Sequence, residues 1–269
     1  PRSTLFPYTT LFRSLEAFRE SEPEGGIRLI ITAGEESGCM GVQHLAGVWN
    51  DPGRARAVIV GEPTANQPAT GHKGALYLNA VTSGLTAHSS MPDLGVNAIY
   101  KAAEAILRIK DLTFEAERDD LLGFPTINVG KISGGLNINS VPDHAEFTVD
   151  IRTTTKTIHE EVLERLKNEL GSGVAIEKLI DLKPLKSDES DPFVQMVYDI
   201  CGVKRSDEEF PKAMTFLTDG SVLQKLYDNV PVIILGPGQP ALAHQTDEYC
   251  FIDKLEQAVA IYKRIIELR

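Results

Sequence analysis

The chain has 269 residues, of which 42% are apolar and 24% charged, a composition typical of a soluble globular protein with one or two domains. Its net charge of −11 disfavours nucleic acid or an anionic membrane as a partner, because phosphate binding needs clustered Lys and Arg. Three widely spaced cysteines are typical of a reducing cytoplasm, and no apolar run reaches the ~18 residues of a membrane span.

The first 14 residues do not resemble natural protein sequence. Residues 4–14 read TLFPYTTLFRS, which resembles the in-frame translation of a sequencing-adapter oligonucleotide, and no initiator Met precedes them. We therefore treat residues 1–14 as a non-native segment outside the fold. On this interpretation the protein's own sequence begins near Leu15, and we expect an upstream segment, with any targeting signal, to be missing.

Apolar runs alternate with short acidic turns from residue 27 onward. Residues 27–33 predict a buried strand that ends at the adjacent carboxylates Glu35 and Glu36. Residues 57–60 predict a second short strand that ends at Glu62. In open α/β sheets, functional groups gather just past the carboxyl ends of the strands, so these three glutamates are candidate site residues.

The pattern changes between residues 74 and 183, where alternating strands and amphipathic helices follow the order β-α-β-β-α-β of a split βαβ unit. We expect its strands over residues 75–83, 125–132, 145–152 and 174–180, and its helices over 98–109 and 157–170. The flanking parts then form one α/β layer. Its further helices are expected over residues 15–20, 39–49, 193–201, 221–227 and 252–268, and its further strands over 213–217 and 230–235.

Three segments of this α/β layer end in metal-binding side chains: Glu36, Glu62 and His244. Carboxylate and imidazole ligands suit Zn²⁺, Mn²⁺ or Co²⁺, and three ligands from separate segments are typical of an open, catalytic site. Glu35 would then be the spare carboxylate that accepts a proton from water. The simpler alternative is that the two adjacent glutamates are solvated surface. Cys39 is a conceivable nucleophile, but no base stands near it in the sequence.

Five motifs together resemble one known enzyme family. They are AGEESG at 33–38, GEPT at 61–64, AHSSMP at 87–92, NSVP at 139–142 and HQTDEY at 244–249. The combination resembles the co-catalytic metallohydrolase family of acetylornithine deacetylase and succinyl-diaminopimelate desuccinylase, which includes aminoacylases and glutamate carboxypeptidases. The resemblance covers essentially all of residues 15–269.

The resemblance implies an α/β/α zinc-peptidase-like catalytic domain, in two parts over residues 15–73 and 184–269. A ferredoxin-like βαββαβ dimerisation domain, or lid, over residues 74–183 would interrupt it. The resemblance also implies a cytoplasmic homodimer that pairs through the lid. Two divalent metal ions bridged by an Asp are expected, zinc first, with cobalt and manganese as alternatives.

The resemblance assigns roles to residues of the catalytic domain. Glu35 resembles the general base, Glu36 and His244 resemble ligands of one metal, and Glu62 resembles a ligand of the other. From its place after an expected strand, Asp219 is a candidate for the substrate pocket, together with Thr218.

The resemblance also assigns roles on the lid. His88 resembles the residue that reaches the partner subunit's site and stabilises the oxyanion there. Asn139 and Arg152 match lid positions that contact substrate, and a guanidinium suits a substrate carboxylate.

The predicted activity is metal-dependent removal of an acyl group from a small N-acyl amino acid, as in amino-acid biosynthesis. Two alternatives stay open: a dipeptidase or carboxypeptidase of the same family, and a non-catalytic, metal-free dimerisation or binding module. The family's upstream His-x-Asp motif and bridging Asp do not occur in residues 15–269. We therefore expect the 269 residues alone to bind metal poorly and not to turn over.

Overall fold

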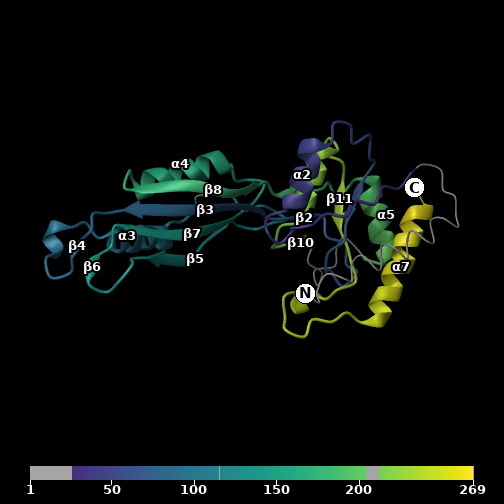
Figure 1. Ribbon diagram of the computed structural model, residues 1–269. Helices are drawn as coiled ribbons and strands as arrows, with labels where there is room; N and C mark the ends of the chain where they lie inside the picture. The colour runs from purple at the N-terminus through teal and green to yellow at the C-terminus, as the bar shows by residue number, and fades with distance from the viewer. Residues whose placement is uncertain (1–25, 115, 204–211, 269) are drawn as a thin grey trace. The chain divides into compact units, whose positions relative to one another are not determined.

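A computed structural model describes residues 26–114, 116–203 and 212–268 (Figure 1). Residue contacts divide the chain into two compact units, and each is described by itself. Unit 2 is Lys73–Pro184, and unit 1 combines the described residues up to His72 with those from Leu185 onward. Unit 2 thus extends one residue beyond the expected domain, residues 74–183, at each end. The segment 1–14 and the helix expected over 15–20 lie outside the described residues.

Unit 2 is built on a four-stranded antiparallel sheet in the order β5-β7-β3-β8. Its strands are β3 (Gly74–Ser83), β5 (Thr126–Gly134), β7 (His144–Thr153) and β8 (Val174–Leu182). Successive side chains of a strand point to opposite faces, and Leu76, Leu78 and Ala80 of β3 are accordingly buried while the residues between them are half-exposed. Beyond the sheet, β4 (Ala87–His88) pairs with β6 (Ser140–Val141).

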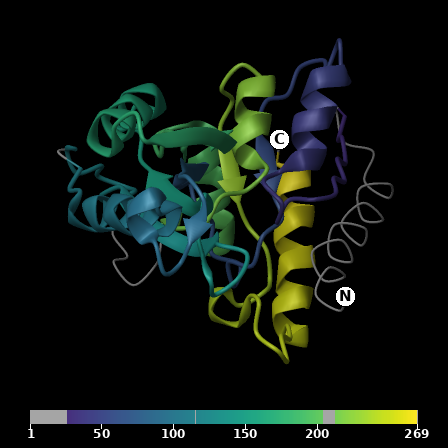
Figure 2. The same ribbon diagram turned by 60° about the vertical axis from the view of Figure 1, so that its left-hand side comes forward.

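Two amphipathic helices, α3 (Ala98–Asp111) and α4 (His159–Leu170), pack against this sheet (Figures 1 and 2). The side chain of Asn97 caps α3 by accepting a hydrogen bond of 3.1 Å from the Tyr100 amide. A short 3₁₀ turn, η1 (Pro92–Leu94), precedes α3. The helices and strands share one core, which includes Leu76, Leu78, Ala102, Ile109, Phe147, Val149, Ile151 and Leu166.

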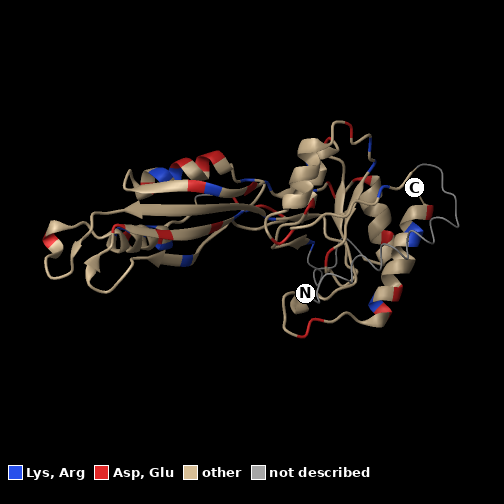
Figure 3. Cartoon of the chain, viewed as in Figure 1, with Lys and Arg blue, Asp and Glu red and all other residues tan. Residues whose placement is uncertain are grey.

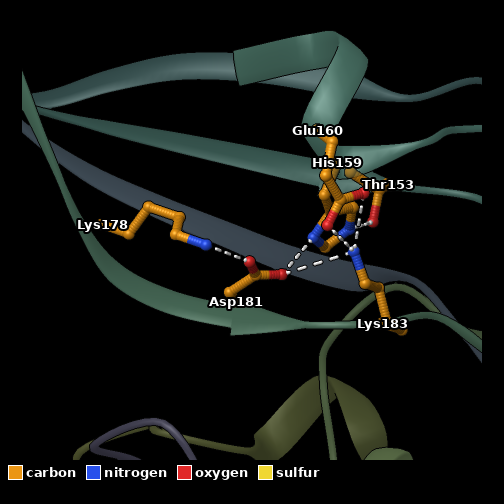
Figure 4. Close-up of polar contacts among 6 residues, drawn as sticks. All are labelled: Thr153, His159, Glu160, Lys178, Asp181 and Lys183. Atoms are coloured by element: carbon orange, nitrogen blue, oxygen red, sulfur yellow. Dashed lines mark hydrogen bonds and ion pairs between the residues drawn. The ribbon is translucent and has the colours of Figure 1, made fainter. Parts of the chain in front are cut away.

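A buried histidine of unit 2 sits in a chain of polar contacts (Figure 4). His159 is 1% exposed, and its Nε2 and Nδ1 lie 2.7 Å from Thr153 Oγ1 and 2.7 Å from Asp181 Oδ1. A carboxylate only accepts, so Nδ1 donates to Asp181 and Nε2 of the neutral ring accepts from the Thr153 hydroxyl. Lys178 Nζ donates to Asp181 Oδ2 at 2.8 Å, and Lys183 Nζ lies 3.6 Å from Oδ1. Every polar atom of the histidine ring therefore has a partner.

Asp119 is a second ionisable residue of unit 2 that is buried and well hydrogen-bonded. Asp119 is 0% exposed, and its Oδ1 accepts hydrogen bonds from the amides of Leu121 at 2.9 Å and Leu122 at 3.0 Å. Its Oδ2 accepts from the amide of Thr155 at 3.2 Å and from the hydroxyl of the same residue. This carboxylate therefore fixes the turn around residues 119–123 to the end of β7.

Unit 1 contains shorter strands. β1 (Val58–Val60) runs parallel to β11 (Val232–Ile234), and β2 (Gly71–His72) lies between β10 (Ala213–Met214) and β9 (Leu185–Lys186). The remaining elements are α2 (Met40–Val48), α5 (Pro192–Cys201), α6 (Gly220–Leu226), η2 (Pro240–Leu242) and α7 (Ile252–Glu267). α5 and α7 contact each other and bury Val197, Tyr198, Ile261 and Tyr262 in a core shared with Ile233.

The strand predicted over residues 27–33 is wrong. This segment carries no strand, and its apolar side chains are half-buried or exposed, with Ile31 at 52%. A strand needs a hydrogen-bonded neighbour, and within the described residues no other strand pairs with it. Arg28 instead stacks on the ring of Trp49, 4.8 Å from its centroid, and donates a hydrogen bond of 3.2 Å to the Tyr227 hydroxyl.

Other predicted elements differ in length. The strands expected over residues 213–217 and 230–235 shrink to β10 and β11, and the two-residue strands β2 and β9 were not predicted. Within the described ranges, no helix is both long and apolar enough to cross a membrane. Lys and Arg occur together with Asp and Glu along α4 and α7 in Figure 3.

Candidate active site

A tight turn between residues 33 and 41 carries the first two candidate carboxylates, Glu35 and Glu36. The amides of Gly38 and Cys39 donate to the Glu35 carbonyl at 2.9 and 2.8 Å, and the amide of Gly41 donates to the Ala33 carbonyl at 2.9 Å. A Cβ on Gly41 would lie 2.3 Å from that carbonyl oxygen, so the start of α2 packs directly on the turn only because residue 41 is glycine. The helix start therefore holds Glu35 and Glu36 in place.

Glu62 follows β1 at the edge where its parallel neighbour β11 also ends. A Cβ on Gly236, just past β11, would lie 2.4 Å from the Glu62 carbonyl oxygen. The hydroxyl oxygen of Thr64 accepts from the Gly236 amide at 3.1 Å, and the Thr64 amide donates to the Gly236 carbonyl at 3.2 Å. This close backbone contact between two strand ends fixes the position of Glu62.

The structure brings these carboxylates within electrostatic reach of one another and of Asp219. Burial, followed by the charges of Glu35, Asp219 and Glu36, raises the pKa of Glu62 to about 8. Burial and the charges of Glu36 and Asp219 likewise raise the pKa of Glu35 to about 7, against a weak lowering by the Cys39 thiol. The charged groups that raise these pKa values are all carboxylates, which is typical of a site that receives protons or a cation.

His244 approaches the same cluster from the segment after η2. Its Nε2 lies 3.7 Å from Glu36 Oε2, and the two side chains are 74% and 73% exposed. The His244 backbone has φ +63°, and its amide donates to Glu248 Oε2 at 3.3 Å. The carboxylate and the imidazole that were predicted as ligands of one metal therefore lie next to each other.

The donor types fit a divalent metal, because carboxylate oxygens and an imidazole nitrogen are what zinc-type sites use. Glu36 and His244 are adjacent, and the half-buried Glu62 lies within electrostatic reach of Glu36. Within the described residues, however, no group of three such donors is close enough to hold a metal ion. The described residues thus offer part of a ligand set.

His88 and Asn139 lie together in unit 2. His88 pairs with Ser140 in the β4–β6 ladder, and the Ser89 amide donates to the Asn139 carbonyl at 3.0 Å. The Nδ1 of His88 accepts from the Ser90 amide at 3.2 Å, so a neutral ring carries its proton on Nε2. The imidazole is exposed and can therefore present Nε2–H as a donor.

Arg152 lies at the other end of β7 from Asn139. It pairs with Ala75, near the start of β3, whereas the β4–β6 ladder follows the end of that strand. The guanidinium contacts Asp150 Oδ1 at 2.9 Å through Nε, donates to the Tyr77 hydroxyl, and stacks over the Tyr77 ring at 5.0 Å. Within one subunit the structure therefore does not bring Arg152 to Asn139.

Thr218 and Asp219 take different positions at the start of α6. Thr218 is 0% exposed, and its hydroxyl oxygen accepts from the Gly220 amide at 3.1 Å, so it presents no surface to a substrate. Asp219 points toward the carboxylate cluster, where its Oδ2 accepts a hydrogen bond of 2.5 Å from Thr32 Oγ1. Thr32 was not among the site residues predicted from the sequence, although its hydroxyl lies next to the acidic turn.

The thiol of Cys39 is not an activated nucleophile. The residue is 0% exposed, and its Sγ lies 3.9 Å from Glu35 Oε1. Burial, together with the charges of Asp219 and Glu35, raises the pKa of this thiol well above its usual range. A thiolate is the reactive form, so these surroundings suppress it.

Comparison with known proteins identifies the family. A profile described as the peptidase dimerisation domain matches residues 70–176. The chain is 30% identical to the acetylornithine deacetylase of Myxococcus xanthus, over 93% of this chain and 67% of that protein. It is 29% identical to a probable succinyl-diaminopimelate desuccinylase of Staphylococcus aureus, over 90% of this chain and 68% of that protein.

The chain belongs to the M20 peptidase family. This confirms the resemblance that the five sequence motifs indicated. The M20 chain is therefore a metallohydrolase of the class that acts on amide bonds.

Solved structures show the same fold. A Staphylococcus aureus tripeptidase superimposes with a TM-score of 0.74 at 23% identity, over 97% of this chain and 69% of that one. An M20 family metallo-carboxypeptidase from Sulfolobus solfataricus superimposes with a TM-score of 0.73 at 18% identity, over 96% and 75%. The M20 chain thus has a mixed α/β fold of this family with a dimerisation domain.

Proposed function

We propose that the protein hydrolyses the amide bond of a small N-acyl amino acid, with Glu35 as the general base. The observation that carries the proposal is the setting of Glu35, a half-buried carboxylate whose pKa is raised to about 7 beside Glu36 and Asp219. A base works best when its pKa lies near the working pH, because it must accept a proton and then release it. Glu35 would take a proton from the attacking water and pass it to the leaving amine.

Glu36 and His244 would hold one divalent metal ion and Glu62 a second, zinc being the first expectation and cobalt or manganese the alternatives. When bound there, the metal would supply Lewis-acid polarisation of the scissile carbonyl. The adjacent Glu36 and His244 support this division of roles, since their side chains meet at 3.7 Å on the exposed side of the cluster. Glu35 would stay free for proton transfer.

His88 would stabilise the oxyanion in the active site of a partner subunit. The exposed Nε2–H, with Nδ1 held by the Ser90 amide, supports this role because it aims a donor outward from the tip of unit 2. It requires a homodimer formed through unit 2, a ferredoxin-like lid in this proposal. Asn139 and Arg152 would contact substrate from that lid, and Arg152 would bind a carboxylate in place of Asp150.

Rates of cleavage of a panel of substrates identify the acyl group and test the peptidase alternative. We expect N-acetyl and N-succinyl amino acids to be cleaved faster than dipeptides, because the named relatives at 29–30% identity are a deacetylase and a desuccinylase. The structural similarity to a tripeptidase keeps short peptides on the panel. Cleavage of dipeptides alone would favour the dipeptidase.

We further propose that residues 1–269 alone bind metal poorly and do not turn over, because the described residues contain no complete group of three metal donors. The test compares this chain with a fusion in which the His-x-Asp segment of an M20 relative precedes it, each with and without Zn²⁺ or Co²⁺. We expect metal-dependent hydrolysis in the fusion. Fast turnover by the 269 residues alone would refute the incomplete ligand set. A fusion that binds no metal and cleaves nothing on the panel would favour the non-catalytic, metal-free module.

Glu35→Gln in the active fusion tests the base itself. We expect hydrolysis to fall at least about 10³-fold while the metal content stays unchanged, because the carboxamide cannot accept the proton. Glu256→Gln, an exposed position on α7, is the matched control and should leave both properties unchanged. Metal lost together with activity would mean that Glu35 is a ligand and that the roles of the two adjacent glutamates are exchanged.

A further inference from the structure

Asp219 stands at the N-terminal end of α6, where an aspartate usually caps the helix. Its side chain, however, accepts no hydrogen bond from the helix amides. The amide of Gly220 bonds to Thr218 Oγ1 at 3.1 Å, and that of Ser221 bonds to the Thr218 carbonyl at 3.2 Å. Because these two amides are satisfied by Thr218, helix capping does not explain the carboxylate of Asp219.

The carboxylate is buried and only partly bonded. Asp219 is 9% exposed, and Oδ2 accepts from Thr32 Oγ1 at 2.5 Å. Oδ1 is buried and accepts no hydrogen bond from a nitrogen or oxygen atom of the described residues. The Cys39 thiol also forms a hydrogen bond with the Asp219 carboxylate, but a thiol is a weak donor, and the carboxylates of Glu35 and Glu62 lie within electrostatic reach. Burying this carboxylate is therefore costly.

Thr32 connects Asp219 to the acidic turn. Thr32 directly precedes Ala33, whose carbonyl accepts from the Gly41 amide at the start of α2. The segment 27–33 has no strand neighbour among the described residues, and the Ala33 backbone and the Thr32 side chain both contact other segments at its end. The Thr32–Asp219 hydrogen bond joins residues 187 positions apart in the chain.

We propose that Asp219 is a positioning residue of the active site: through the Thr32 hydroxyl it fixes the turn that carries Glu35 opposite Glu62. This inference rests on the proposed role of Glu35 as the base. It gives the buried carboxylate a reason that helix capping does not. It also explains why residues 27–33 can present a functional turn without belonging to a sheet.

Hydrogen exchange of the turn amides, followed by mass spectrometry on the full 269-residue chain, tests the proposal. The amides of residues 38–41 report the turn, because each donates to a carbonyl of residues 33–35. In Thr32→Val and in Asp219→Ala we expect them to exchange about tenfold faster, as for loss of a hydrogen bond to a charged group. The double variant should exchange no faster than Asp219→Ala alone, because the Thr32–Asp219 hydrogen bond is already lost in that variant.

Two further variants separate positioning from a structural role. Asp219→Asn keeps an oxygen that accepts from Thr32, so we expect exchange at residues 38–41 to return to within about twofold of the original protein. Asp191→Ala is the matched control. Asp191 does cap its helix, since Oδ1 accepts from the Phe193 amide at 2.7 Å, so exchange should accelerate at the start of α5 and not in the turn.

Two results would overturn the proposal: unchanged exchange at residues 38–41 in Thr32→Val, or additive effects of the two single changes. If Asp219→Ala does not fold, the comparison of Thr32→Val with Thr32→Ser tests the proposal. Serine keeps the hydroxyl donor, so exchange at residues 38–41 should accelerate in Thr32→Val and not in Thr32→Ser. Exchange is measured without metal or substrate. A failed deacylase assay therefore leaves this test intact, and a failed exchange test leaves the assay of Glu35 intact.

Discussion

Unit 2 and unit 1 differ in the surroundings that they give to ionisable side chains removed from solvent. In unit 2, Asp119 accepts four hydrogen bonds, and His159 lies between Thr153 and Asp181. In unit 1, Glu62 and Asp219 lie near further carboxylates. The charged groups that shift the pKa of Glu62 are all carboxylates, and none is a cation. Paired groups stabilise a fold, whereas buried charges without a counter-charge destabilise it and are typical of functional sites.

The difference extends to the backbone. The sheet of unit 2 pairs β3 with β7 over ten residues, while β1 and β11 of unit 1 pair over only three. In unit 1, Glu62 follows the three-residue strand β1, and the turn that carries Glu35 follows a segment without strand structure. Regular structure in unit 2 serves stability, and the interrupted structure of unit 1 provides the site.

Of the changes considered, Asp119→Ala should have the largest effect on stability, and we expect it in unit 2 alone. Removing the carboxylate leaves the amides of Leu121, Leu122 and Thr155 without their acceptor, and the amide of Leu122 is then left in a buried place. We expect the free energy of unfolding of unit 2 to fall by about 3 kcal/mol. Hydrogen exchange of β3 and β7 amides measures it, with exchange in α5 and α7 as the internal reference for unit 1.

Asp143→Ala, an exposed aspartate of the same unit, is the control and should change exchange in β3 and β7 by less than about twofold. Equal destabilisation of both units by Asp119→Ala would contradict the view that this charge serves unit 2 alone.

Much of unit 2 could be predicted from the sequence, because its signals are local and periodic. The alternation in residues 75–83 and the apolar spacing in residues 98–109 correspond to β3 and α3 within two residues. The strand predicted over 27–33 failed because pairing depends on a neighbour that the segment itself does not encode. Two-residue strands such as β2 have no period to detect.

The site divides in the same way. Glu35, Glu36 and Glu62 could be proposed because each follows an apolar run, a local signal. The contact of Thr32 with Asp219 spans 187 positions, and no local pattern predicts which distant side chain fills a buried place. Thr218 was predicted to line the substrate pocket, but its hydroxyl oxygen accepts a hydrogen bond from the Gly220 amide. Its neighbour Asp219 contacts Thr32 beside the acidic turn instead.

Glu62→Gln should stabilise unit 1, whereas Asp119→Ala should destabilise unit 2. Burial and neighbouring carboxylates raise the pKa of Glu62 from 4.5 to about 8, so in the metal-free protein the folded state loses stability as pH rises between these values. Above pH 8 the ionised group is disfavoured in the folded state. We expect Glu62→Gln to raise the free energy of unfolding of unit 1 at pH 9 by about 2 kcal/mol, and by much less at pH 5.

Hydrogen exchange of β11 and α7 amides in the presence of a chelator measures this gain, and Glu256→Gln should show none. A loss of stability in Glu62→Gln at pH 9 would mean that Glu62 is paired after all. The contrast between the two units would then fail at its main point.

The smallest effect is the acid sensitivity of unit 2. Burial lowers the pKa of His159 below its usual 6.5, against the raising effect of Asp181, so the folded state favours the neutral ring. Burial also raises the pKa of Asp181, but the hydrogen bonds from Lys178 and His159 outweigh it and hold this pKa at about 2. Both folded pKa values lie below the unfolded ones, so the unfolded chain binds more protons as pH falls.

Stability from His159 is therefore present above pH 6.5 and lost below it, and stability from Asp181 is lost from pH 3.8 toward 2. We expect unit 2 to lose about 1 kcal/mol in all, since Asp181 is partly exposed and screened by solvent. Exchange of β7 and β8 amides between pH 7.5 and 5, corrected for the intrinsic rate, reports the histidine part. His159→Gln should flatten this profile, whereas His144→Gln, an exposed position on β7, should not. As pH falls from 7.5 to 5, unit 1 should gain stability from Glu62 while unit 2 loses stability from His159. A change of the same sign in both units would contradict the proposed difference between their ionisable groups.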